Sequence, residues 1–183
     1  MRRILVLSHV YPRPDSRAYG TFVAARVRGV ARGAAVEVVA PLPWFPFAHR
    51  VGRMRRSAVP HAARLDGIPV HYPTVPSLPG IGRSLDPVLF AGALLPLLRR
   101  IRTRFPFELI DAHFGYPDGV AAVMLGRRLG CPVMLTLRGN EQVIVAHALP
   151  RRQLAWALRH GCVVAVSEPL ARLARDLGAP SVR

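Results

Sequence analysis

The sequence predicts an α/β fold, a doubly wound and mainly parallel sheet with helices on both faces. Short runs of β-branched and apolar residues alternate with helical segments along the whole chain. Most of these runs are apolar at every position, which is the pattern of parallel strands covered on both sides. Strand and helix alternation of this kind builds right-handed βαβ units, as in a Rossmann-like sheet. The expected strands are residues 3–7, 36–40, 68–71, 109–112, 133–137 and 163–166.

The segments between these strands are expected to be helices. Residues 19–32 place three valines on one stripe and most of their arginines elsewhere. Residues 85–105 form an apolar helix with four arginines near its C-terminus, where the helix dipole favours positive charge. The last helix, 168–177, has apolar residues at i, i+3, i+4 and i+7, with Ser167 as its expected N-cap and Gly178 as its stop.

Length and composition limit the classes of protein that fit. The 183 residues suit a single domain over positions 1–183, and the 51% of apolar residues excludes an intrinsically disordered chain. All 26 basic residues are arginine, and with 10 acids they give a net charge of +16, which predicts acidic partners. The two cysteines cannot form a disulfide scaffold or a metal site alone.

The N-terminus resembles a signal peptide only briefly. Its apolar run ends after four residues at Ser8, short of the ~7 to 15 residues that a signal peptide needs. No apolar stretch approaches the ~20 residues of a membrane-spanning helix. The sequence therefore predicts a cytoplasmic protein.

One stretch breaks the alternation. Residues 41–66 are expected to be an irregular insertion in which aromatic residues precede clustered arginines. Such a cluster suits a membrane interface, where guanidinium groups meet anionic lipid at ~1 kcal/mol per charge; a purely structural role is the alternative. The residues expected to contact the membrane are Trp44, Phe45, Phe47, Arg50, Arg53, Arg55 and Arg56.

Ligands of an open α/β sheet bind beyond the carboxyl ends of the strands, at the point where the strand order reverses. With the usual order 3-2-1-4-5-6, the first and fourth strands flank that point, so His9 and His113 are expected to share a crevice. Tyr19 and Gly20 end the first loop beside a helix N-terminus, which can offer backbone N–H groups to a phosphate. The loop lacks the Gly-x-Gly-x-x-Gly pattern of a dinucleotide site, and no P-loop occurs.

A second candidate lies at the end of the fifth expected strand. Arg138 is suited to bind a phosphate or a carboxylate. An ion pair with Asp111, Asp118 or Glu141 is an equally open alternative. The turn that follows completes the expected substrate-binding residues, which are Arg138, Gly139, Asn140 and Glu141.

Five short segments together resemble the acceptor half of GT-B glycosyltransferases, specifically the family-four group of retaining enzymes. They are the opening run to Ser8 with Pro12 and residues 20–23, then residues 36–41, 111–119, 136–139 and 164–168. The resemblance implies transfer of a sugar from a nucleotide-sugar donor to an acceptor, in a cleft between two Rossmann-like domains and without a metal or other cofactor. It also implies that His113 is catalytic, near the transferred sugar, that Gly20 lies near the donor diphosphate, and that Arg138 faces the cleft.

In that family a C-terminal domain holds the donor through a basic pair and a Glu-x7-Glu motif. No Glu-x7-Glu occurs in these 183 residues. We therefore expect an acceptor domain that folds but is inactive without its C-terminal domain. The expected partners are a nucleotide sugar, a sugar or lipid-linked acceptor and an anionic membrane surface. The expected setting is cell-envelope or exopolysaccharide assembly, peripheral at the inner face of the plasma membrane.

Two other readings remain open at this stage. The chain can be a non-catalytic module for an anionic polymer, although its arginines are dispersed and no recognised nucleic-acid motif appears, which makes nucleic acid an improbable partner. It can also be half of a GT-B-like sugar-nucleotide epimerase, in which histidine and carboxylates near Asp111 and His113 would do acid–base chemistry.

Overall fold

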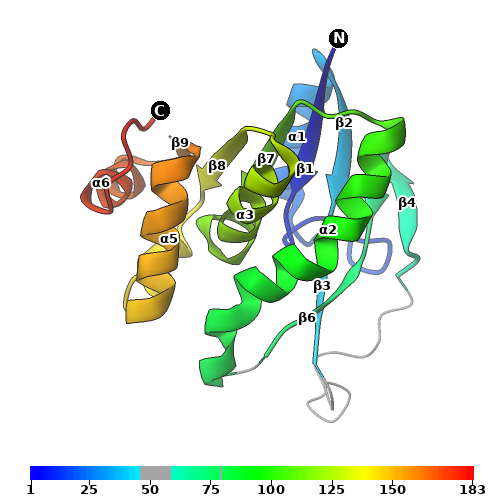
Figure 1. Ribbon diagram of the computed structural model, residues 1–183. Coiled ribbons are helices and arrows are strands. Elements are labelled where there is room, and N and C mark those ends of the chain that lie inside the picture. The colour runs from blue at the N-terminus through cyan, green and yellow to red at the C-terminus, as the bar shows by residue number, and fades with distance from the viewer. Residues whose placement is uncertain (46–58, 79) are drawn as a thin grey trace.

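A computed structural model describes residues 1–45, 59–78 and 80–183, and its centre is a seven-stranded sheet with the order β4-β5-β2-β1-β7-β8-β9 (Figure 1). Every neighbouring pair is parallel except β4 and β5. Without β4, this is the order 3-2-1-4-5-6 that the sequence predicts. The strands are β1 Arg2–Leu7, β2 Ala34–Val39, β4 Ala62–Leu65, β5 Ile68–His71, β7 Leu109–His113, β8 Val133–Leu137 and β9 Cys162–Ala165.

Helices cover both faces of the sheet, which explains why the central strands are apolar throughout. In β1, Leu5 and Leu7 pack in a core with α2, α3 and α5, whereas Val6 packs in a second core with α1. Figure 1 shows α2, α3 and α5 in front of the sheet and α1 behind it. The helices are α1 Thr21–Ala31, α2 Asp86–Arg104, α3 Val120–Leu129, α4 Glu141–Ile144, α5 Ala148–His160 and α6 Glu168–Asp176.

The ends of the helices follow local chemistry. Gly20 precedes α1 with a φ of 69°, and a Cβ atom there would lie 2.6 Å from the carbonyl oxygen of Val10. Only glycine fits this close approach of the first loop to the helix. Ser167 is the N-cap of α6, as predicted, but its side chain makes no capping hydrogen bond. Gly178 follows α6 with a φ of 89°, which confirms it as the stop of that helix.

The segment 41–66, expected to be irregular, contains two strands. β3 (Leu42–Trp44) pairs with β6 (Thr74–Pro76) in a small parallel sheet, and β4 pairs with β5 in an antiparallel hairpin. Asp66 and Gly67 form the turn of that hairpin with φ values of 52° and 77°. Two positive φ values are what a two-residue hairpin turn requires, and Asp-Gly is a strong signal for it. The expectation was wrong at the C-terminal end of the segment because it ignored this turn signal, and wrong at the N-terminal end because β3 pairs with a strand about 30 residues away.

Within the described ranges, no helix is long and apolar enough to cross a membrane.

Candidate functional site

The loops after β1 and β7 meet at the carboxyl edge of the sheet. The backbone N–H of His9 lies 3.3 Å from both carboxylate oxygens of Asp118, and the Nδ1 atom of His9 also bonds to that carboxylate. Asp118 is fully buried, and the side chain of His9 keeps 23% of its surface exposed. Because Nδ1 is engaged, Nε2 is the nitrogen of His9 that remains for a ligand.

The charge of His9 follows from its surroundings. Burial lowers the pKa of His9, but the charge of Asp118 and its hydrogen bond to the ring outweigh that effect, so the net shift is upward. Arg83 opposes the rise and Asp86 adds to it. The carboxyl edge of the sheet therefore holds an imidazole that is oriented by a buried carboxylate and protonates more readily than a free histidine.

His113, which was expected to share a crevice with His9, is not exposed at the edge of the sheet. Its side chain is fully buried, although the sequence places it at a strand end where exposure was expected. His113 is opposite Thr136 in the strand register, and Arg138 bonds to its ring. The Nε and one terminal nitrogen of Arg138 lie 3.3 and 3.2 Å from Nδ1 of His113.

The surroundings of His113 determine its charge and which ring nitrogen carries the proton. Burial, and then the charges of Arg138 and Arg26, lower the pKa of His113 to about 3, so the imidazole is neutral at physiological pH. Since Nδ1 accepts from Arg138, the proton of the neutral ring is on Nε2. His113 is thus unsuited to take up a proton, and it can act only as a hydrogen-bond donor or as a support for Arg138.

Around His113 several buried polar atoms lack a partner. They include Oδ1 of Asp111, Nε2 of His113, Oγ1 of Thr136 and Nε of Arg26. Asp111 and His113 are two residues apart on β7 and share the face on which α1 lies, and Nε2 of His113 is 3.8 Å from Oδ2 of Asp111. We call the group formed by Arg138 and these four residues the strand-end cluster; the four are Arg26, Asp111, His113 and Thr136. Buried polar groups are nearly always hydrogen-bonded, so an unsatisfied cluster at the carboxyl edge of the sheet points to a polar ligand or to ordered water.

Asp111 is the acid of the strand-end cluster. Burial raises its pKa to about 6, and the charges of Arg26 and Arg138 limit the rise. The sequence signalled Asp111 as a polar residue in an apolar strand. It gave no sign of Arg26 or Thr136, because their place in the cluster depends on how α1 and β8 pack against β7.

Arg138 is the cluster residue that reaches the surface. It is partly exposed, and its guanidinium carbon lies 5.2 Å from the centre of the Phe22 ring. The side chain of Arg138 forms no ion pair with Asp111, Asp118 or Glu141, which answers the alternative that the sequence left open. Its position between His113 and Phe22 leaves the guanidinium group available to an anion.

The buried side chain of Glu141 stabilises the loops that carry the site. Its buried carboxylate accepts backbone hydrogen bonds from Gly115 at 2.6 Å, from Arg138 at 3.1 Å and from Gly139 at 2.8 Å. The carboxylate therefore joins the loop after β7 to the loop after β8. Glu141 was expected to bind substrate, whereas the structure gives it a structural position because three N–H groups occupy its oxygens. Asn140 is exposed and makes no capping bond to α4.

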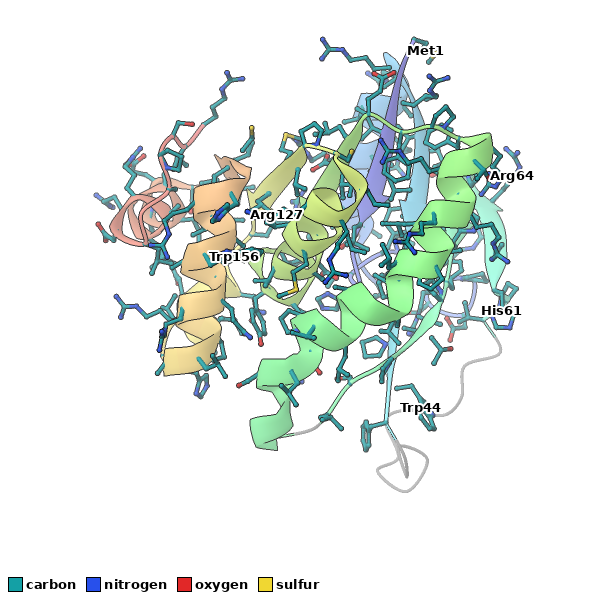
Figure 2. All side chains as sticks on the ribbon, in the orientation of Figure 1. Met1, Trp44, His61, Arg64, Arg127 and Trp156 are labelled. Atoms are coloured by element: carbon teal, nitrogen blue, oxygen red, sulfur yellow. The ribbon has the colours of Figure 1, made fainter. Side chains whose placement is uncertain are left out.

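The remaining expected residues lie apart from the strand-end cluster. Tyr19 is exposed, with the guanidinium carbon of Arg13 5.6 Å from its ring centre. Trp44 is 42% exposed at the end of β3, at the end of the molecule opposite Met1 (Figure 2). Phe45 is partly buried. The other residues expected at a membrane lie outside the described residues: Phe47, Arg50, Arg53, Arg55 and Arg56.

In the part of the chain that the structure describes, no group of three His, Cys, Asp or Glu side chains is placed to hold a metal ion.

Fold and site together define the class of the protein. A mainly parallel sheet of order 3-2-1-4-5-6 with polar residues at its carboxyl edge is a Rossmann-like domain, the fold expected of the N-terminal domain of a GT-B protein. The chain belongs to Glycosyltransferase Family 4, whose family model matches residues 21–183. Both the fold class and the family that the sequence predicts are confirmed.

A curated relative and several solved structures are similar to the chain. It is 28% identical over 150 residues to a protein of Bacillus subtilis (strain 168) named as the teichuronic acid biosynthesis glycosyltransferase TuaC. The aligned residues cover 79% of this chain and 38% of TuaC. Sucrose-phosphate synthase from Thermosynechococcus elongatus superposes with a TM-score of 0.64 at 12% identity, over 100% of this chain and 47% of that one. UDP-N-acetylglucosamine 2-epimerase from Rickettsia bellii gives a TM-score of 0.56 at 10% identity, over 98% and 43%. The two structures show the fold alone, and the chain spans less than half the length of each of these proteins.

Proposed function

We propose that the chain is the acceptor-side domain of a glycosyltransferase of the hexosyltransferase type. Together with a donor-binding domain, it transfers a sugar from a nucleotide-sugar donor to a polysaccharide or lipid-linked acceptor. Membership of Glycosyltransferase Family 4 supports this, and so does a relative named for teichuronic acid biosynthesis. The chain spans 38% of TuaC and 47% of sucrose-phosphate synthase, which supports a second domain as the source of the donor site.

The strand-end cluster is the observation that carries the proposal. Arg138 offers a guanidinium group to an anionic group of the substrate, and His113 holds it through Nδ1. The neutral His113 acts as a positioning residue, because its Nδ1 atom accepts hydrogen bonds from the guanidinium group of Arg138. His9 presents Nε2 to a sugar hydroxyl from the opposite loop, because Asp118 fixes its other nitrogen. Gly20 shapes the first loop at the N-terminus of α1, where backbone N–H groups can meet a phosphate.

A chimera tests this function. The chain is fused to the remaining part of TuaC, and transfer of labelled sugar from a nucleotide-sugar donor is measured for the fusion and for the 183-residue chain alone. Transfer by the fusion only is expected. Arg138→Gln should lower kcat/KM about 10- to 100-fold, because a charge-assisted hydrogen bond is worth ~1.5–3 kcal/mol. Arg172→Gln, an exposed arginine on α6, is the matched control.

Two results would contradict the proposal. Turnover of a nucleotide sugar by the isolated chain at ordinary rates would show that no second domain is needed. Equal activity of the Arg138→Gln and Arg172→Gln fusions would remove the strand-end cluster from the site. The likeness to an epimerase concerns the fold alone, and no contact among the described residues favours the epimerase or the polymer-binding reading.

We also propose that the acceptor is membrane-proximal and that the protein acts at the inner face of the plasma membrane. The net charge of +16 and the exposed ring of Trp44 support this. Binding to vesicles that contain phosphatidylglycerol should weaken in Trp44→Ala and at high salt, since screening shortens electrostatic attraction. Binding that neither change affects would rule out this contact.

A further inference from the structure

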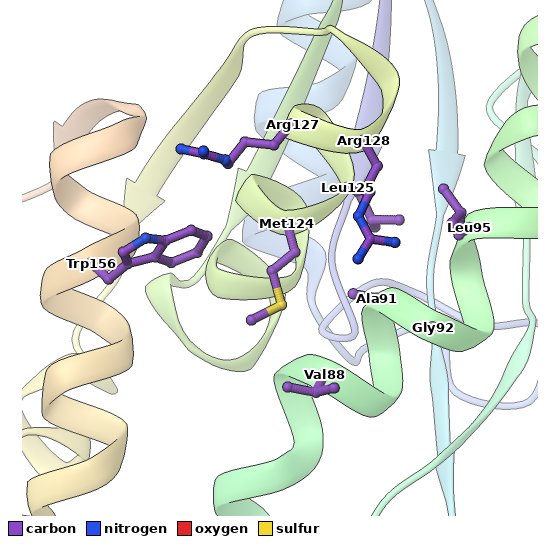
Figure 3. Close-up of a pocket in the computed structure, with 9 residues that line it drawn as sticks. All are labelled: Val88, Ala91, Gly92, Leu95, Met124, Leu125, Arg127, Arg128 and Trp156. Atoms are coloured by element: carbon purple, nitrogen blue, oxygen red, sulfur yellow. The ribbon is translucent and has the colours of Figure 1, made fainter.

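An apolar groove lies between α2, α3 and α5, on the face of the sheet opposite α1. Its volume is about 420 Å³, which is within the usual range for small-molecule sites. α2 contributes Val88 and Leu95, α3 contributes Met124 and Leu125, and α5 contributes Trp156 (Figure 3). None of these residues belongs to the loops at the carboxyl edge of the sheet, so the groove is separate from the site described above.

The groove uses a second apolar stripe on α2. The first stripe, which includes Phe90, Leu94 and Leu98, is buried in the core. Val88, Ala91 and Leu95 form the second stripe at i, i+3 and i+7, and they line the groove. Val88 is 51% exposed. The outer face of a surface helix is normally polar, so an apolar stripe that faces solvent indicates a surface with a partner.

The same three helices carry a strong positive charge. They hold nine arginines and one acid, Asp86, which is buried and accepts hydrogen bonds from the backbone of Leu78 and the hydroxyl of Ser77. Two of the arginines, Arg102 and Arg104, bond to other parts of the fold. The other seven are exposed and make no ion pair with any described residue: Arg99, Arg100, Arg127, Arg128, Arg151, Arg152 and Arg159.

Arg127 and Arg128 lie at one end of the groove. Both line it, and Figure 3 shows their side chains above Met124 and on the side away from Val88. The groove thus combines apolar side chains, a tryptophan ring and arginines at one end. In a membrane interface the same three kinds of side chain contact the hydrocarbon, the headgroup level and the anionic surface, respectively. The charge complements an anion, and guanidinium groups bind phosphate through paired hydrogen bonds.

We propose that this groove binds a hydrocarbon chain of an anionic phospholipid, with its phosphate held by Arg127 and Arg128. A bilayer that contains such lipids is therefore the partner of the α2–α3–α5 face. A peptide fits less well, because the lining side chains offer no hydrogen-bond acceptor to its N–H groups, whereas a hydrocarbon chain needs none. The proposal does not depend on sugar transfer or on Trp44.

The fluorescence of Trp156 provides the test, since Trp44 and Trp156 are the two tryptophans of the chain. In the 183-residue chain carrying Trp44→Phe, emission is followed during titration with vesicles. One set is pure phosphatidylcholine, and the other is an equal mixture with phosphatidylglycerol. A shift of Trp156 emission to shorter wavelength is expected with the anionic vesicles only.

Variants in the same background separate the groove from net charge. Arg127→Gln with Arg128→Gln should weaken vesicle binding roughly 30-fold, at ~1 kcal/mol for each arginine near an anionic surface. Arg2→Gln with Arg172→Gln removes the same charge from exposed positions on β1 and α6, and should change binding less than about threefold. Val88→Glu should abolish the emission shift, while circular dichroism confirms that each variant is folded.

Three outcomes would overturn the proposal. Equal losses in the two double variants would mean that only net charge matters. An unshifted Trp156 on bound protein would place the membrane contact elsewhere. A concentration-dependent dimer in sedimentation that Val88→Glu disrupts, without vesicle binding, would assign the groove to a second copy of the chain. Each of these outcomes leaves sugar transfer by the TuaC chimera unaffected, so the two proposals fail independently.

Discussion

Removal of the Glu141 carboxylate should destabilise the whole domain. Glu141→Ala leaves three backbone N–H groups without their acceptor, those of Gly115, Arg138 and Gly139. Gly115 is buried, so its N–H bears the cost of an unsatisfied donor, about 1–3 kcal/mol, whereas water can reach the other two more easily. We expect a loss of about 2–4 kcal/mol in the free energy of unfolding, a large share of the ~5–15 kcal/mol of a typical domain.

The assay is urea unfolding followed by circular dichroism. The midpoint should fall with the m-value unchanged, because the same surface is exposed on unfolding. Glu108→Ala is the matched control, since Glu108 is exposed. Its Oε1 atom lies 3.7 Å from a terminal guanidinium nitrogen of Arg3, and such a surface ion pair contributes at most ~1 kcal/mol. If Glu141→Ala cost no more than Glu108→Ala, the view of Glu141 as the link between the two loops would be refuted.

Three further predictions concern the loops and the buried acid. Gly20→Ala should destabilise the protein by more than about 2 kcal/mol because of its positive φ and the contact with the first loop, whereas Gly29→Ala, in open space on α1, should stabilise it by ~0.5–1 kcal/mol; urea unfolding compares the two. In an NMR titration, the His9 ring should titrate above 6.5, and Asp118→Asn should bring its pKa below the wild-type value. The stabilisation from a protonated His9 is present at low pH and is lost as pH rises through the raised pKa. Asp111, with a pKa raised to about 6, should make stability fall as pH rises from about 4 to about 6; Asp111→Asn should remove that fall, and an unchanged pH profile would show that Asp111 is not desolvated.

The sheet was predictable from the sequence because its determinants are local. Apolar runs over residues 3–7 and 133–137 mark strands covered on both faces, and the alternation with helices indicates that the strands are parallel, so the order usual for such sheets could be expected. The β4–β5 hairpin was equally local, and the Asp66-Gly67 pair would have revealed it. The pairing of β3 with β6 was not local, since it joins residues about 30 positions apart through three-residue strands.

The site was predictable only in outline. The meeting of His9 with the loop after β7 followed from the strand order, and the structure shows it through Asp118. The burial of His113 did not follow, because it depends on tertiary packing, in which the side chain of Arg138 on another strand end bonds to Nδ1 of the ring. The role of Glu141 was missed for a similar reason, since a carboxylate in a turn looks the same in sequence whether it faces a ligand or three backbone N–H groups.

The central place of β1 in the sheet has a consequence for synthesis of the protein. One neighbour, β2, ends at Val39, but the other, β7, is complete only at His113. At ~5–20 residues per second, the ribosome needs about 4 to 15 s to make the chain between them. During that interval the Leu5 to Leu7 edge of β1 has no strand to pair with, and an unpaired apolar edge invites association with other chains. A nascent chain of this protein is therefore most vulnerable to aggregation, and most in need of a chaperone, before residue 113 leaves the ribosome.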